Sequence, residues 1–79
     1  MADERVEIYQ NMGERIKFRR LELGLTQVDV SLRLGIPQQS YSDIELGTCH
    51  TRLDRIAAIA HLFRSSPCWF AFGIGKGGE

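Results

Sequence analysis

Residues 26–46 read TQVDVSLRLGIPQQSYSDIEL, and this stretch decides the fold. Thr26 is suited to cap a helix, because its hydroxyl can accept from a first-turn amide. Gly35 can end that helix in the left-handed conformation, and the fixed φ of Pro37 suits the start of a second helix over residues 38–46. Two short helices joined by a glycine-containing turn are the pattern of a helix-turn-helix.

Apolar residues at three- and four-residue steps predict further helices on both sides of the motif. The first is long and ends at Gly24, with its stripe at Val6, Tyr9, Met12, Ile16 and Leu23. The fourth has its stripe at Leu53, Ile56, Ile59, Ala60 and Phe63, and Pro67 begins a short fifth helix. Gly13 costs a helix about 1 kcal/mol relative to Ala, so residues 1–12 form either part of the first helix or a separate turn.

The predicted fold is a compact all-α domain of five helices within 79 residues, where every helix must share one core. We expect residues 1–12 to be a helical N-terminal extension, residues 13–73 the helix-turn-helix domain, and residues 74–79 a flexible glycine-rich tail. Tyr41, Trp69 and Phe70 are expected in the core. His50 and His61 are isolated and are expected in a loop and on the surface.

Composition narrows the function classes. Ten Lys plus Arg balance ten Asp plus Glu, which does not fit a sequence-blind nucleic-acid binder acting through bulk positive charge. Cys49 and Cys68 lie far apart without metal-ligand spacing, so we expect neither a disulfide, a metal nor a cofactor. The apolar run over residues 67–74 is too short to span a bilayer. A cytoplasmic protein without a membrane partner is expected.

Polar side chains on short arms gather in the second helix of the motif. They are Gln38, Gln39, Ser40, Ser42 and Asp43. Such groups read base edges in the major groove, where Gln pairs with adenine and Asp accepts from cytosine. An enzyme is not expected, because nucleophile elbows, paired carboxylates and metal-ligand spacings are missing from the sequence.

Five features carry a resemblance to a known family. They are Leu25-Thr26-Gln27, Leu34-Gly35-Ile36, Gln38-Gln39-Ser40, Ile44-Glu45 with Gly47, and Trp69. Over residues 13–73 the chain resembles the Cro and lambdoid-phage-repressor (XRE-type) class of helix-turn-helix domains. The resemblance implies that Gln27 binds a phosphate and supports the reading helix. It also places Arg20 and Glu45 on facing surfaces, where an ion pair is expected.

The expected DNA-binding residues are Thr26, Gln27, Gln38, Gln39, Ser40, Ser42, Asp43 and Thr48. Asp43 departs from the family pattern, because many relatives place a neutral or basic residue there. The loop over residues 48–51 lacks the lysines and arginines that relatives use to clamp the DNA backbone. Thr51 replaces a common proline and Arg64 a common glycine, and we expect the fold to tolerate both. Arg15, Lys17 and Arg19 form either a solvated face or a phosphate-binding patch.

Double-stranded DNA is therefore the expected partner. A repressor or controller would bind a palindromic operator as a homodimer, with its reading helices one DNA turn, about 34 Å, apart. Phe72 and Ile74 are the candidates for dimer contacts, because exposed apolar groups often mark an interface. The alternative is a protein-interaction module, such as an antitoxin-like domain that holds a protein partner.

Overall fold

The computed structural model describes residues 4–48 and 50–74. Within them the chain forms five helices and no strand, which confirms the predicted all-α class. The helices are α1 (Glu4–Glu22), α2 (Gln27–Leu34), α3 (Gln38–Leu46), α4 (Leu53–Leu62) and α5 (Pro67–Phe72). Residues 1–3 of the expected extension, Cys49, and residues 75–79 of the expected tail lie outside the described residues.

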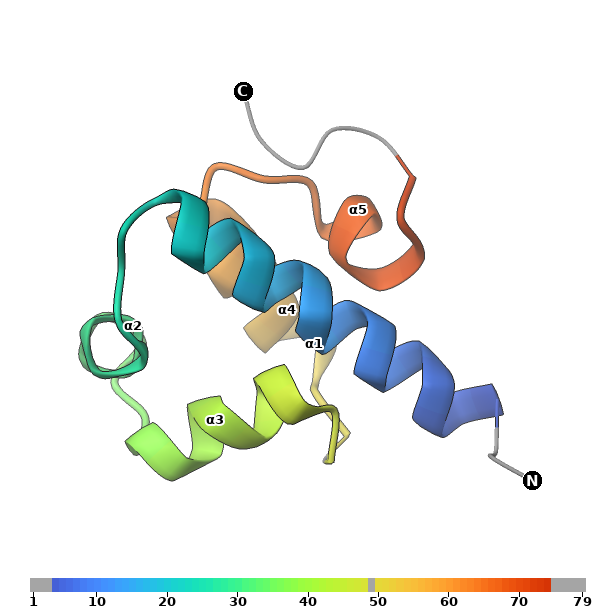
Figure 1. Cartoon of the computed structure of the whole chain (residues 1–79), viewed down its shortest axis with the longest axis horizontal. Helices are drawn as coiled ribbons and strands as arrows, with labels where there is room; N and C mark the ends of the chain where they lie inside the picture. Colours follow the sequence, from blue (N-terminus) through green and yellow to red (C-terminus); the bar gives the residue numbers. More distant parts are fainter. Residues whose placement is uncertain (1–3, 49, 75–79) are drawn as a thin grey trace.

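The long helix α1 is the centre of the arrangement. It packs against α3 on one side and against α5 on the other (Figure 1). α2 packs against α3, and α4 packs against α5. Since α3 rests on both α1 and α2, its position depends on residues from all three helices.

One core joins the five helices. Its buried apolar side chains are Met12, Ile16, Val30, Tyr41, Ile44, Ile56, Ile59, Ala60, Phe63 and Phe70. Tyr41 and Phe70 are fully buried as predicted, and Trp69 is half-buried against the same core. Leu53 begins the apolar stripe predicted for α4, but as the first residue of that helix it is 76% exposed.

Left-handed residues mark the ends of the elements. Gly24, Gly35 and Gly47 follow α1, α2 and α3 with φ near +70°. Arg64 has φ 53° in the turn after α4, at the position where the resemblance led us to expect a glycine in relatives. The fold thus accepts a non-glycine residue in a conformation that glycine adopts at lower cost. In the described part of the chain, no helix has the length and apolar character needed to cross a membrane.

Candidate nucleic-acid interface

The start of α2 is closed by a reciprocal pair of hydrogen bonds. The Thr26 hydroxyl accepts from the Asp29 backbone N–H at 3.1 Å, and the Asp29 carboxylate accepts from the Thr26 N–H at 3.0 Å. These bonds from Thr26 lower the pKa of Asp29. The hydroxyl keeps its own hydrogen, so Thr26 can cap the helix and still donate to an anion in front of it.

A single carboxylate joins α1, α2 and α3. Glu45, near the end of α3, accepts from Arg20 Nε of α1 at 2.7 Å and from Arg20 Nη2 at 3.2 Å. Arg20 Nη1 also donates to the Leu25 carbonyl at 2.8 Å, just before α2. Gln27 Nε2 of α2 donates at 3.1 Å to Glu45 Oε1, the same oxygen that accepts from Arg20 Nη2. This fork-shaped pairing fixes α3 relative to both neighbours.

Burial and hydrogen bonding act on Glu45 in opposite directions. Burial alone would raise the pKa of its carboxyl group, but the hydrogen bonds from Arg20 and Gln27 outweigh that effect and lower the pKa. The hydrogen bond to Glu45 raises the pKa of Arg20. The pair is therefore ionised at neutral pH, and the charge of each partner is compensated inside the protein.

Glycines allow the backbones of α1 and α3 to touch. A Cβ atom on Gly13 would lie 2.3 Å from the Glu45 carbonyl oxygen and 2.7 Å from that of Ile44. A Cβ atom on Gly47 would lie 2.5 Å from the Gln10 Cα. The last turn of α3 is consequently seated directly on α1, without side chains between them.

The opposite face of α3 carries the expected base-reading residues. Gln38 and Gln39 are exposed, and Ser42 and Asp43 on the same face are half-exposed. Gln39 Nε2 donates to Asp43 Oδ1 at 3.0 Å, so these two side chains are joined to each other. Ser40 lies at the edge of this face, where it lines a small cleft toward α4.

The remaining expected DNA-binding residues flank this face. Gln27 is half-buried and bound to Glu45, which leaves its carbonyl oxygen and one N–H for a second partner. Thr48 is exposed just after the end of α3, and its hydroxyl lies 3.5 Å from the Asp43 carbonyl oxygen. Pro37, the residue before α3, provides no side-chain cap. Its first-turn amides are thus open toward an anion.

Arg15, Lys17 and Arg19 of α1 were expected to form either a solvated face or a phosphate-binding patch. Two of them make hydrogen bonds within the protein instead. Arg15 Nη1 donates to the Phe70 carbonyl of α5 at 3.0 Å. Arg19 Nε donates to the Phe63 carbonyl and the Ser65 hydroxyl, each at 3.1 Å. Lys17 is exposed and lines a polar cleft with Gln27 and Glu45. Of these three residues, only Lys17 is left for a contact with phosphate.

Arg55 is a candidate that the sequence reasoning missed. This exposed residue in the first turn of α4 lines the cleft of about 260 Å³ that also contains Ser40 and Asp43. It also lines a second cleft beside the α2–α3 turn. Its guanidinium has no hydrogen-bond or ion-pair partner in residues 4–48 and 50–74, unlike Arg52, which lies 3.4 Å from Asp54. The sequence does show basic residues after position 47. That one of them lies near α3 becomes apparent only in the folded chain.

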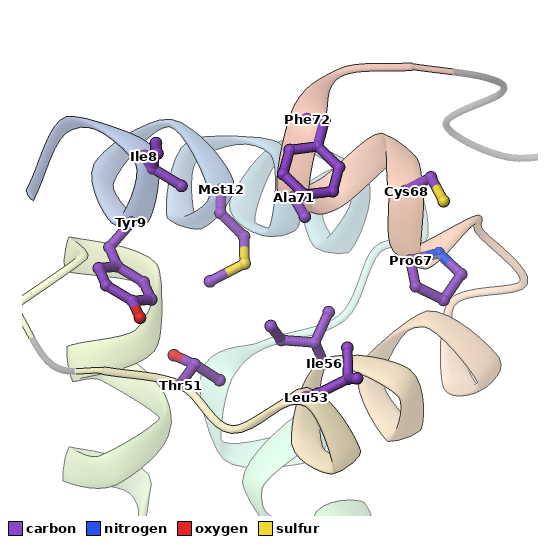
Figure 2. A pocket seen from close by; sticks show the side chains of 10 residues that line it. All are labelled: Ile8, Tyr9, Met12, Thr51, Leu53, Ile56, Pro67, Cys68, Ala71 and Phe72. Carbon is purple, nitrogen blue, oxygen red and sulfur yellow. The ribbon is translucent and has the colours of Figure 1, made fainter. Parts of the chain in front are cut away.

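An apolar groove lies on another side of the molecule. Its volume is about 320 Å³, and it is bordered by α1, α4 and α5, with Ile8, Met12, Leu53 and Phe72 among its side chains (Figure 2). None of its lining residues belongs to α2 or α3. Phe72 and Ile74, the expected dimer contacts, are 66% and 67% exposed. An apolar partner could cover this groove while the outward face of α3 stays accessible.

The geometry of this site can be compared with known protein families. A family described as Helix-turn-helix matches residues 16–70, a span that runs from α1 into α5. No solved structure matches the chain.

Proposed function

This chain belongs to the Cro and C1-type helix-turn-helix family of DNA-binding regulators, and we propose that it reads a palindromic operator as a homodimer through α3. A repressor or controller of transcription is the function that this arrangement supports best. The observation that carries the proposal is the contrast between the two sides of α3. Its inner side is fixed by Glu45 and the Gly13 contact, while its outer side presents polar groups.

Base reading requires such a fixed helix, because a side chain must reach a base edge within hydrogen-bond distance. Gln38, Gln39, Ser42 and Asp43 are the proposed base-reading residues, with Ser40 at their edge. Thr26, Gln27 and Thr48 are the proposed contacts to the DNA backbone on one side of α3. Arg55 is added on the other side, as a phosphate contact from α4.

The homodimer is proposed from the apolar groove and the residues beside it. Exposed Phe72 and Ile74 lie at and next to a groove made by the same chain, so a twofold axis could pair the projection of each copy with the groove of the other. The second copy meets no overall charge repulsion, because the chain has a formal net charge of zero.

Selection from a random-sequence duplex pool tests the base-reading function. We expect the purified protein to enrich a palindromic motif at low salt. Gln38→Ala should relax discrimination at particular bases by about 1–3 kcal/mol, whereas Gln27→Ala should weaken all sequences alike. Absence of any enriched motif would contradict the regulator and favour the alternative, a protein-interaction module such as an antitoxin-like domain.

A further inference from the structure

The hydrogen bond between Gln39 and Asp43 limits what this face of α3 can recognise. The two residues lie one helical turn apart, and Gln39 Nε2 donates to Asp43 Oδ1 at 3.0 Å. No other hydrogen bond or ion pair of these two side chains occurs in the described residues. Gln39 is exposed and Asp43 half-exposed, so both keep polar atoms free for an outside partner.

The free atoms of this pair are mostly hydrogen-bond acceptors. Gln39 retains its carbonyl oxygen and one N–H, and Asp43 contributes only acceptor lone pairs. In the major groove, acceptors are satisfied by the exocyclic amines of adenine N6 and cytosine N4. The O6 and N7 of guanine and the O4 of thymine are acceptors as well, and a carboxylate facing them would be left without a partner.

We infer that Gln39 and Asp43 act as one reading unit that selects amino-bearing bases at two adjacent base pairs. Gln39 reads adenine, using its carbonyl oxygen and its second N–H, and Asp43 reads cytosine at the next base pair. Residues four apart on a helix are separated by about 6 Å along its axis. Neighbouring base pairs are about 3.4 Å apart, so a helix inclined in the groove reaches two of them. This inference rests on the proposed function.

A carboxylate close to DNA phosphates needs a positive neighbour. Arg55 lines the same small cleft as Asp43, and no ion pair joins the two in the described part of the chain. Its guanidinium can therefore bind the phosphate beside the base pair that Asp43 reads. In this arrangement Asp43 reads cytosine, and Arg55 offsets the repulsion between the Asp43 carboxylate and the DNA phosphates because it binds a phosphate itself.

The experiment compares the motifs selected by the wild type and by single variants from the same random duplex pool. The wild type should enrich adenine and cytosine at adjacent positions of each half-site. Asp43→Ala should lower the preference for cytosine about tenfold and leave the adenine preference in place. Asp43→Asn should shift the preference at that position from cytosine toward adenine, because an amide pairs with adenine.

Two further variants test whether the pair acts as a unit. Gln39→Ala should relax both positions, because Asp43 loses the bond that orients it. Gln38→Ala is the matched control, since it removes a glutamine from the same face that is not bound to Asp43. It should relax discrimination at a different position and leave these two positions unchanged. The three side chains that these variants change lie on the surface, and thermal unfolding of each variant checks that the fold is kept.

The outcomes separate the inference from the function on which it rests. If the wild type enriches a motif but Asp43→Ala and Asp43→Asn keep every base preference, the reading unit is wrong and the regulator stands. If Gln39→Ala relaxes only one position, the two residues read independently, which also overturns the inference. If the wild type enriches no motif, both the function and the reading unit are wrong.

Discussion

At the level of one residue, Gly13 occupies a position where the fold leaves no room for a side chain. In an isolated helix, replacing glycine by alanine gains about 1 kcal/mol. Here a Cβ atom would lie 2.3 Å from the Glu45 carbonyl oxygen, which belongs to the backbone of α3 and cannot rotate away. For a side chain at position 13, the clash with α3 therefore costs more stability than the better helix propensity provides.

We expect Gly13→Ala to lower the free energy of unfolding by about 1–3 kcal/mol, the usual cost of overpacking. Urea unfolding followed by circular dichroism measures this change. Asn11→Ala is the matched control, because Asn11 is exposed on the same helix and should gain stability slightly from helix propensity. A Gly13→Ala protein as stable as the wild type would mean that α1 and α3 are not in direct backbone contact.

At the level of elements, α1, α2 and α3 meet at Glu45. Its pKa is lowered in the folded state, so the stabilisation from its charge is fully present above the unfolded pKa of about 4.3. That stabilisation is lost as the pH falls through the lower folded pKa. Acid should thus loosen α3 from α1 and α2 before it affects contacts among apolar side chains.

We expect the unfolding midpoint in urea to fall between pH 6 and pH 3, and the fall to be smaller in Glu45→Gln. At pH 6 this variant should be less stable by about 2 kcal/mol, because a charged hydrogen bond becomes a neutral one. Asp29 also has a lowered pKa and therefore also contributes to the loss of stability in acid. Asp29→Asn is the control, because this carboxylate binds Thr26 and does not join α3 to its neighbours. An equal pH dependence in Glu45→Gln and the wild type would contradict the role of Glu45.

The sequence predicted the elements better than their contacts. Capping residues and apolar periodicity are local signals, so the helices of the motif and their ends at Gly35 and Gly47 could be predicted. The need for a glycine at position 13 could not, because its reason is the backbone of α3 more than 30 residues away. The roles of Arg15 and Arg19 likewise depend on the carbonyls of Phe70 in α5 and of Phe63 just after α4, which only the fold brings near.

At the level of the whole molecule, charge is scarce where DNA would bind. Arg15, Arg19 and Arg20 make internal bonds, so several of the ten basic residues are unavailable for phosphate. Affinity should therefore depend only weakly on salt for a DNA-binding protein, because few counterions are released. Arg55 is one of the cations that remain, and its removal should be visible in that dependence.

We expect Arg55→Ala to reduce the slope of log affinity against log salt by about 0.9, the value for one phosphate contact. Base preferences should stay unchanged, since phosphate contacts carry no direct sequence information. Fluorescence anisotropy on the selected duplex at several salt concentrations measures the slope. Arg64→Ala is the control, because the α4–α5 connection that carries it lies across α1 from α3 (Figure 1). Equal slopes in the wild type and Arg55→Ala would remove Arg55 from the interface.

The weak charge also bears on the proposed homodimer. With few phosphate contacts per chain, we expect useful affinity to need two copies of α3, joined by the proposed interface at Phe72 and Ile74. We expect Phe72→Asp and Ile74→Asp to sediment as monomers where the wild type sediments as a dimer. Binding to the full palindrome should fall about 100-fold, whereas binding to one half-site should be unchanged.

Two comparisons make this result specific to the proposed interface. Phe18→Asp places the same charge on an apolar side chain that is 58% exposed but does not line the groove, so it should remain dimeric. Inserting five base pairs between the half-sites rotates them by about half a DNA turn and should weaken the wild type but not the Phe72→Asp monomer. A wild type indifferent to this insertion would bind as independent chains, and then the affinity would have to come from α3 and its flanking contacts alone.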